Sequence, residues 1–370
     1  MQQPEIRVLI SGGGTGGHIF PAIAIANALK QLNEKNEILF VGAYGRMEME
    51  KVPAAGYKIE GLNISGIQRK FSLSNLKLPF KIIRSVLKAR AIVRSFKPDV
   101  AVGVGGYASG PLLYAATAMD VPSLIQEQNS FAGITNKILA KRVQKICVAY
   151  EGMEKYFPKE KIILTGNPVR QDLLNLNGKK EEGLKSFGLD SSKPTLLVIG
   201  GSLGARTINE CILDRMEKIS SAGVQMIWQT GKAFFPRVVE LKSEALKKGI
   251  CITEFIQRMD LAYAAADVVV SRAGASSVSE LSLAGKPSIL IPSPNVAEDH
   301  QTKNAMALVN KNAAMLVKDS KAKEELIDAA LQLVINKEMQ SLLSGEIKKL
   351  AMPDSAKKIA GIVYDLAKKK

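Results

Sequence analysis

The chain has 370 residues, 46% of them hydrophobic, and a formal net charge of +16. This length favours two domains over one core, and the hydrophobic share is enough to fill both. The three cysteines are far apart and form no C-x-x-C pair, which argues against a disulfide framework or a structural zinc site. This cysteine usage fits a reducing cytoplasm. The positive charge suits a nucleic acid, a membrane surface or a phosphorylated substrate as partner, and a lysine-rich surface tuned for solubility is the alternative.

Neither a signal peptide nor a membrane span is expected. No charged-then-apolar segment precedes the first predicted strand, which begins near Ile6. The uncharged run 100–119 is long enough to cross a bilayer, but it contains four glycines and a proline. We therefore interpret it as a strand, a loop and a helix.

In chain order, short apolar segments alternate with helical patterns, which indicates parallel α/β sheets. The strands predicted in the first half are 6–11, 37–42, 99–105, 122–126, 145–150 and 161–166. Those of the second half are 195–201, 224–231, 249–256, 266–272 and 286–292. Each half opens with a strand, a glycine loop and the start of a helix, so the pattern predicts two Rossmann-like domains of similar design.

The join between the domains is expected near residues 166–174, which gives domains 1–166 and 167–354. A polar stretch, 175–192, leads into the second domain. The last helix, about 355–368 in the final segment 355–370, can pack on either domain. The first helix is expected to begin near Pro21.

Three glycine-rich loops, 12–17, 103–110 and 200–205, follow predicted strands. Backbone N–H groups at the start of a helix bind phosphate, and open α/β sheets bind ligands at the carboxyl ends of their strands. One such loop is a weak signal, because glycines also simply permit tight turns. Three of them favour phosphate-bearing ligands and argue against a non-catalytic basic adaptor.

The spacing of Gly12, Gly14 and Gly17 also suits a nicotinamide-dependent oxidoreductase, the alternative from another enzyme class. That function needs an acidic residue at the end of the second strand to hold the ribose. Here the strand ends without an acid until Glu48, which disfavours it. His18, which closes the first loop, instead suits proton transfer near a diphosphate; a helix-start histidine bonded to backbone is an equally good interpretation of this residue alone.

Residues 61–98 contain nine Lys or Arg and no Asp or Glu. Within them, 79–94 has the pattern of an interfacial helix that binds anionic lipid headgroups. Its apolar residues and the basic residues between them are Phe80, Ile83 and Leu87, and Lys81, Arg84 and Lys88. An ordinary amphipathic helix packed on the sheet is the alternative. Nucleic-acid binding is disfavoured because the segment lacks interleaved aromatic residues for base stacking.

Several motifs occur in one order from residue 6 to about 317: GGGTGGH with FPA, GVGGYASGP, EQN, GNPVR, GGSLGAR and SRAGASSVSEL…GKPSILIP. Together they resemble the bacterial MurG family of UDP-N-acetylglucosamine transferases over nearly the whole chain. The resemblance implies a GT-B fold, with two Rossmann-like domains facing a cleft, the nucleotide on the C-terminal domain and the acceptor on the N-terminal one.

The resemblance also implies the reaction. N-acetylglucosamine would pass from UDP-N-acetylglucosamine to undecaprenyl-diphosphate-muramyl-pentapeptide (lipid I to lipid II) in peptidoglycan synthesis, a process tied to cell shape and division. The enzyme would be peripheral, at the cytoplasmic face of the cell membrane, and would need no cofactor. No D-x-D sequence, the usual metal–nucleotide clamp of the other major glycosyltransferase fold, occurs in the chain, and no metal is expected.

Carried onto this sequence, the family pattern implies the following site. The catalytic base would be His18, and the loop for the acceptor diphosphate would contain Gly105, Gly106 and Tyr107. The donor would be bound by Thr15, Gly16, Gly17, Asn129, Arg170, Ser202, Ile256, Ala275, Ser276, Ser277, Val278, Ser279, Glu280 and Gln301. Among these, a backbone group of Ile256 would read the uracil, Glu280 the ribose hydroxyls and Gln301 the sugar hydroxyls.

One position departs from the pattern: Gln126 stands where some members have histidine before EQN. This leaves His18 as the matched imidazole. The remaining alternatives are a related GT-B lipid glycosyltransferase and a UDP-N-acetylglucosamine 2-epimerase. An epimerase would want a second histidine at the sugar, and only His300 is available.

Overall fold

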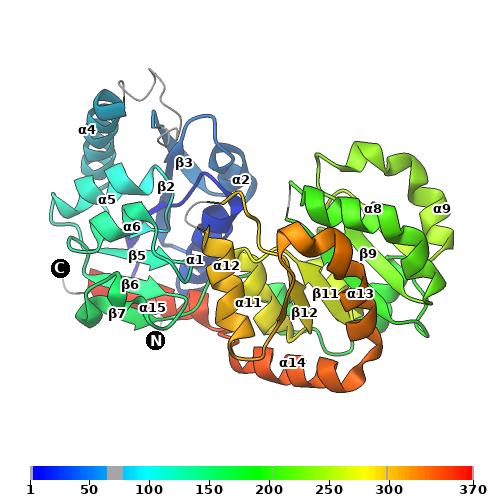
Figure 1. Ribbon diagram of the computed structural model, residues 1–370. Helices are drawn as coiled ribbons and strands as arrows, with labels where there is room; N and C mark the ends of the chain where they lie inside the picture. The colour runs from blue at the N-terminus through cyan, green and yellow to red at the C-terminus, as the bar shows by residue number, and fades with distance from the viewer. Residues whose placement is uncertain (1–2, 65–77, 202, 297–298, 369–370) are drawn as a thin grey trace. The chain divides into compact units, whose positions relative to one another are not determined.

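The computed structural model describes residues 3–64, 78–201, 203–296 and 299–368. The chain divides into two compact units, one formed by Met1–Val169 with Asp354–Lys370 and the other by Arg170–Pro353. Each unit is built on a parallel sheet with helices on its faces (Figure 1). Among the described residues, no helix is long and apolar enough to cross a membrane.

In the described part of the N-terminal unit, seven parallel strands lie in the order β3-β2-β1-β4-β5-β6-β7. They are β1 (Arg7–Ser11), β2 (Glu37–Ala43), β3 (Lys58–Leu62), β4 (Val100–Gly103), β5 (Ser123–Glu127), β6 (Lys145–Val148) and β7 (Ile162–Leu164). The helices of this unit are α1 (Gly16–Leu32), α2 (Glu48–Ala54), α4 (Leu78–Phe96), α5 (Ser109–Thr117), α6 (Ile134–Leu139) and α15 (Ser355–Ala367).

In the described part of the C-terminal unit, six parallel strands lie in the order β10-β9-β8-β11-β12-β13. They are β8 (Thr195–Ile199), β9 (Gln225–Gln229), β10 (Ile250–Thr253), β11 (Val268–Ser271), β12 (Ser288–Leu290) and β13 (Met315–Leu316). Its helices are α7 (Lys180–Ser186), α8 (Arg206–Ser221), α9 (Lys242–Lys247), α10 (Met259–Ala265), α11 (Ala275–Ala284), α12 (His300–Val309), α13 (Ala322–Ile335) and α14 (Lys337–Lys349). Short 3-10 turns cover Met153–Lys155, Lys159–Lys161, Gln171–Leu174, Phe235–Arg237, Val239–Leu241 and Asp319–Lys321.

Both strand orders place the first and fourth strands of the unit side by side, with the chain running outward in opposite directions from that pair. This is the doubly wound arrangement, and its ligand crevice lies at the carboxyl ends of those two central strands. The loops that follow β1 and β4, and β8 and β11, are therefore the places where the fold positions a site.

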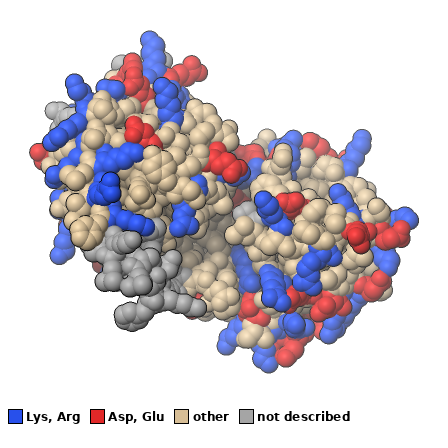
Figure 2. All heavy atoms as spheres, turned by 90° about the horizontal axis from the view of Figure 1, so that it is seen from above, with Lys and Arg blue, Asp and Glu red and all other residues tan. Residues whose placement is uncertain are grey.

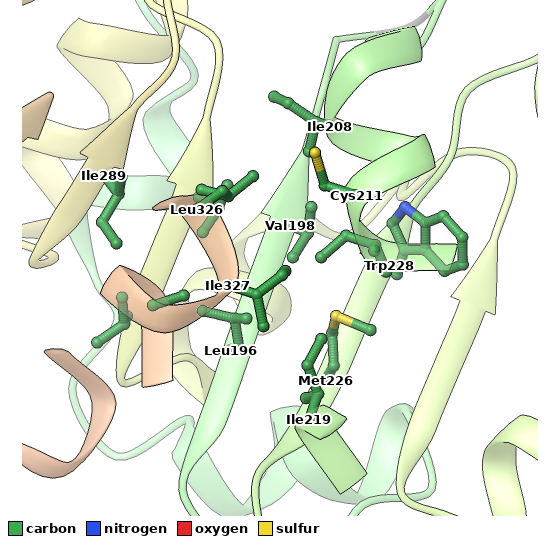
Figure 3. Close-up of a cluster of buried hydrophobic side chains, with 14 of the residues drawn as sticks. Leu196, Val198, Ile208, Cys211, Ile219, Met226, Trp228, Ile289, Leu326 and Ile327 are labelled. Atoms are coloured by element: carbon green, nitrogen blue, oxygen red, sulfur yellow. The ribbon is translucent and has the colours of Figure 1, made fainter. Parts of the chain in front are cut away.

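The sheet of the N-terminal unit is covered on both faces by apolar side chains. Along β1, Leu9 belongs to the core beneath α4 and α5, whereas Val8 and Ile10 belong to the core beneath α1 and α15. Successive side chains of a strand point to opposite faces, so a strand buried on both sides is a continuous apolar run. The C-terminal unit has a similar core, in which the Trp228 indole packs among aliphatic side chains and donates from Nε1 to Asn209 Oδ1 at 3.0 Å (Figure 3).

The prediction of elements missed two strands and misplaced the start of one helix. Strands β3 and β13 were not predicted, and α1 begins at Gly16 rather than near Pro21. Pro21 lies in the second turn of α1, where its missing N–H removes one hydrogen bond without ending the helix. His18 therefore lies in the first turn of α1 instead of before it.

Candidate active site

The two glycine loops of the N-terminal unit interlock. Gly13 N donates to Gly105 O at 3.3 Å, and Val104 N donates to Ser11 O at 2.7 Å. A Cβ at Gly106, where φ is +90°, would lie 2.3 Å from Gly13 O, so only glycine permits this approach. The buried Ser109 hydroxyl ties the second loop to the end of β1 by donating to Ser11 O at 2.8 Å, and it also lies 3.0 Å from Gly105 O.

His18 lies against these loops. The ring is half-buried, and its Nδ1 is 2.8 Å from Gln128 Oε1. A Cβ at Gly105 would lie 2.8 Å from both Cε1 and Nδ1 of the ring, so the missing side chain of Gly105 makes room for the imidazole. Thr15 at the start of α1 and Tyr107 in the second loop are exposed beside this region.

Glu48 supports the first loop, a role that the sequence did not indicate. The side chain is buried, and its carboxylate accepts from Gly14 N at 2.9 Å and from Ala43 N at 3.0 Å. A Cβ at Gly13 would overlap the same carboxylate, at 2.3 Å from Oε1. Glu48 thus joins the first glycine loop to the end of β2 through two backbone N–H groups.

Asn129 follows β5 and is held by its neighbour Glu127. One oxygen of the buried Glu127 carboxylate accepts from the backbone N and the Nδ2 of Asn129, at 3.1 and 3.3 Å. The other accepts from Gly133 N at 3.0 Å and Asn136 Nδ2 at 2.9 Å. The carboxylate therefore fixes the whole turn between β5 and α6, and with it the position of Asn129.

In the C-terminal unit the loop after β8 is also shaped by glycine. Gly204 has φ of +81°, and a Cβ there would lie 2.1 Å from Thr230 O. Ser202, predicted to contact the donor, lies outside the described residues. Gln229 bridges this loop to the predicted uracil position, because its Nε2 donates to Gly201 O at 3.2 Å and its Oε1 accepts from Ile256 N at 2.9 Å. The N–H of Ile256 is therefore paired with Gln229, a residue that the sequence did not indicate.

The loop after β11 leads into α11, whose first turn contains the predicted residues Ala275 to Val278. Ser276 Oγ is buried and has no hydrogen-bond partner among the described residues. Ser279 Oγ donates to Ala275 O at 3.0 Å, within the helix itself. An unpaired buried hydroxyl at the positive end of a helix is suited to an anionic ligand.

Glu280, Arg170 and Tyr263 form one electrostatic group. Burial raises the pKa of Glu280 to about 7, against the opposing effect of the Arg170 guanidinium and a 3.3 Å hydrogen bond from the Tyr263 hydroxyl. Arg170 itself forms a two-point ion pair with Asp172, at 3.2 and 2.9 Å, and donates to Gln257 O at 2.9 Å. The Arg170 guanidinium therefore interacts with two carboxylates, that of its ion-pair partner Asp172 and that of Glu280 in the predicted donor site. Gln301, elsewhere in this unit, accepts from Ser293 N at 2.9 Å.

Within each unit the structure brings some of the predicted residues together, whereas Gln301 pairs elsewhere and Ser202 lies outside the described residues. His18, Gly105 and Gly106 come together at the ends of β1 and β4, while Arg170 and Glu280 come together beside α11. Ile256 is connected to the loop after β8 through Gln229. The predicted residues thus lie near the carboxyl ends of strands, where this fold binds ligands.

Comparison with known proteins agrees with this arrangement. Family models described as the glycosyltransferase family 28 N-terminal and C-terminal domains match residues 8–148 and 195–359. A transferase of Phocaeicola vulgatus is 57% identical over 371 residues, covering 99% of this chain and 98% of the relative. It is named UDP-N-acetylglucosamine–N-acetylmuramyl-(pentapeptide) pyrophosphoryl-undecaprenol N-acetylglucosamine transferase. A protein of the same name from Cytophaga hutchinsonii is 58% identical over 365 residues, with 99% and 98% coverage.

Among solved structures, MurG of Acinetobacter baumannii superposes with a TM-score of 0.75 at 27% identity, covering 98% of this chain and 100% of that one. The prediction of two Rossmann-like parallel-sheet domains of the GT-B class is confirmed. The chain belongs to glycosyltransferase family 28 and, within it, to the MurG family of N-acetylglucosamine transferases.

Proposed function

We propose that this enzyme transfers N-acetylglucosamine from UDP-N-acetylglucosamine to undecaprenyl-diphosphate-muramyl-pentapeptide, converting lipid I to lipid II in peptidoglycan synthesis. The observation that carries the proposal is His18, set against two interlocked glycine loops in a chain that matches these transferases over nearly its whole length. The N-terminal unit takes the acceptor, with its diphosphate at Gly105, Gly106 and Tyr107. The C-terminal unit takes the nucleotide.

In the proposed reaction His18 takes the proton of the attacking acceptor hydroxyl. The hydroxyl oxygen forms a bond to the anomeric carbon as the bond from that carbon to the diphosphate breaks. UDP leaves with the electron pair, and the configuration at the anomeric carbon inverts. The transition state has oxocarbenium character, as in glycosidases.

Charge that develops on the leaving diphosphate requires fixed positive groups. The helix starts after β8 and β11 and the Arg170 guanidinium supply them in the proposed donor site. The unpaired Ser276 hydroxyl adds a donor at the same helix start. Glu280 accepts from the ribose hydroxyls, Ile256 reads the uracil edge and Gln301 binds the sugar. Thr15, Gly16, Gly17 and Asn129 contact the sugar and diphosphate from the N-terminal unit.

A peripheral membrane site on α4 completes the proposal. The predicted apolar residues Phe80, Ile83 and Leu87 are 72%, 58% and 57% exposed, while Ala89 and Val93 on the same helix are buried. An apolar surface interleaved with Lys81, Arg84 and Lys88 suits insertion among anionic headgroups. In Figure 2 other Lys and Arg side chains are spread over both units with Asp and Glu among them, so the combination of exposed apolar and basic residues, rather than charge alone, favours α4.

The test compares transfer with nucleotide binding in His18→Ala and His18→Gln. We expect both variants to bind UDP as the wild type does and to lose roughly 10²–10⁴-fold in turnover with a lipid-diphosphate muramyl-pentapeptide acceptor. His18→Gln forms hydrogen bonds but cannot accept the proton, so it should do no better than alanine. Near-normal turnover of either variant would remove His18 as the base, and loss of UDP binding would make it a donor-site or structural residue.

A further inference from the structure

Behind His18 the N-terminal unit buries an array of side-chain amides. Gln126 and Gln128 lie at the end of β5, and Asn167 lies beyond β7; all three are buried. Gln128 Oε1 faces His18 Nδ1 at 2.8 Å. No step of the proposed reaction uses these amides, yet one of them touches the ring that is to accept the proton.

The orientation of the Gln128 amide is determined by its other contacts. Its Nε2 lies 2.8 Å from Val104 O and 3.1 Å from Gln126 O. Both are backbone carbonyls, which only accept, so the atom between them must be the NH₂ group. A flipped amide would place its oxygen against two carbonyl oxygens and leave buried acceptors without a donor, which is unfavourable.

This orientation dictates the protonation of the imidazole. The atom of Gln128 that faces the ring is a carbonyl oxygen, an acceptor only, so the neutral ring must donate from Nδ1. Its Nε2 then carries the lone pair. Free histidine side chains in water favour the opposite tautomer, with the proton on Nε2, in which the ring would present a donor instead of a base.

We propose that Gln128 is a positioning residue that holds neutral His18 in the Nδ1–H tautomer and so turns its Nε2 into the proton acceptor. The inference rests on the proposed role of His18 as base. When the acceptor hydroxyl gives its proton to Nε2, the ring becomes doubly protonated, and Gln128 Oε1 keeps its bond to Nδ1–H throughout. Because the partner is a neutral amide, it selects the tautomer without the strong stabilisation of imidazolium that a carboxylate would add.

A second layer keeps Gln128 in place. Gln126 accepts a hydrogen bond from the Gln128 amide and donates from its own Nε2 to Asn167 Oδ1 at 2.9 Å. Asn167 Nδ2 donates to Gln128 O at 3.0 Å, which closes the array. The nearby carboxylate of Glu127 is directed instead to Asn129, Gly133 and Asn136.

The tautomer can be measured directly, because the chain contains only two histidines, His18 and His300. We would record long-range proton–nitrogen correlation spectra of protein with isotope-labelled histidine rings at alkaline pH, with His300→Gln to assign the signals. The expected result is a protonated, pyrrole-type Nδ1 and a pyridine-type Nε2 for His18 in the folded wild type. An Nε2–H tautomer there would overturn the proposal without need of any Gln128 variant.

Gln128→Met, similar in length but without the amide, should shift His18 toward the Nε2–H tautomer. Its kcat should fall roughly 10²-fold or more, as expected for a base held in the wrong tautomer, with the KM for UDP-N-acetylglucosamine little changed. Gln225→Met, which removes a buried glutamine amide from the C-terminal unit, is the matched control and should keep the Nδ1–H tautomer. Gln128→Glu should also keep it and move the acid limb of the pH–rate profile to higher pH, because a carboxylate stabilises the imidazolium.

If Gln128→Met left both the tautomer and kcat unchanged, the positioning role would be wrong. The failure of the proposed function has a different signature. If His18 is not the base, His18→Ala keeps its turnover. The spectra of the wild-type protein still decide, independently of that result, whether the His18 ring is in the Nδ1–H tautomer.

Discussion

At the scale of single residues, Glu280 gives the site a pH dependence. Burial raises its pKa to about 7, so the side chain is protonated below that pH and ionised above it. Relative to the unfolded chain, its contribution to stability is present below the ordinary glutamate pKa and is lost as pH rises through about 7. A carboxylate accepts from two ribose hydroxyls better than a carboxylic acid does, so binding should show the opposite trend.

We therefore expect the affinity for UDP-N-acetylglucosamine, measured by calorimetry, to increase as pH rises through about 7. The diphosphate of the intact donor is esterified at both ends and does not titrate in this range. Glu280→Gln should bind more weakly above pH 7, by about 1.5–3 kcal/mol, and should lose the pH dependence. Glu338→Gln, an exposed acid of the same unit, is the control. Unchanged affinity in Glu280→Gln would take Glu280 out of the nucleotide site.

Motif order marks His18, Glu280 and Ile256 in the sequence as candidate site residues, but it does not show which side chains hold their neighbours in place. Gln128 is 110 residues from His18, and Glu48 is 34 residues from the glycine it holds. A contact between such distant positions depends on which strands lie side by side. Gln128 stands in the EQN motif, but the motif does not show which side chain its amide contacts, and nothing in the local pattern around Glu48 distinguishes it from an ordinary polar residue.

At the scale of elements, the strands that are continuous apolar runs could be predicted from the sequence. The strands that lack such a run, and form through hydrogen bonds to a neighbouring strand, could not. β3, with the sequence KIEGL, alternates polar and apolar residues at the edge of its sheet and is held by β2. β13 is two residues long and pairs only with β12. The start of α1 was misplaced because proline is commonest in the first turn, whereas here glycines begin the helix.

The exposed face of α4 should bind membranes. Replacing Phe80, Ile83 and Leu87 together by Ser should reduce sedimentation with anionic vesicles and leave UDP affinity intact, because the side chains are exposed and their loss opens no cavity. Higher salt should weaken the wild type in the same assay, since headgroup attraction is screened. The control replaces Ile335, Met339 and Leu342 by Ser; these exposed apolar residues belong to the C-terminal unit. Wild-type sedimentation of the α4 variant would place membrane contact elsewhere.

The last helix, α15, packs in the core of the N-terminal unit although 184 residues assigned to the other unit, Arg170–Pro353, precede it. Tyr364 of α15 exchanges hydrogen bonds with the buried Asn36, at 2.7 and 3.0 Å. Ile359→Ala should therefore destabilise the N-terminal unit by about 2–5 kcal/mol, through lost burial and a cavity. Lys358→Ala, exposed on the same helix, should stay within about 0.5 kcal/mol.

The chain has a single tryptophan, Trp228, in the core of the C-terminal unit, which allows the two units to be followed separately. In Ile359→Ala, circular dichroism should show an earlier denaturant transition, while the Trp228 fluorescence transition stays in place. An equal shift of both transitions would contradict the assignment of α15 to the N-terminal unit alone.

At the scale of the whole molecule, the two units have the same doubly wound design. The strand order explains why the glycine loops, His18 and the start of α11 lie at carboxyl ends of central strands in their respective units. The fold could be predicted because the pattern of strand, glycine loop and helix occurs twice. The chemistry could be predicted only through the motif order, because a UDP-sugar epimerase of the same class would need the same nucleotide-binding parts.

The most direct test of the central claim is a competition between donors. Wild-type enzyme is given the lipid-diphosphate muramyl-pentapeptide acceptor with equal amounts of UDP-N-acetylglucosamine and UDP-glucose, and the lipid products are weighed by mass spectrometry. We predict that the acceptor gains the mass of one N-acetylhexosamine, with release of UDP. A hexose product, or an unmodified acceptor with epimerised UDP-sugar, would contradict the account.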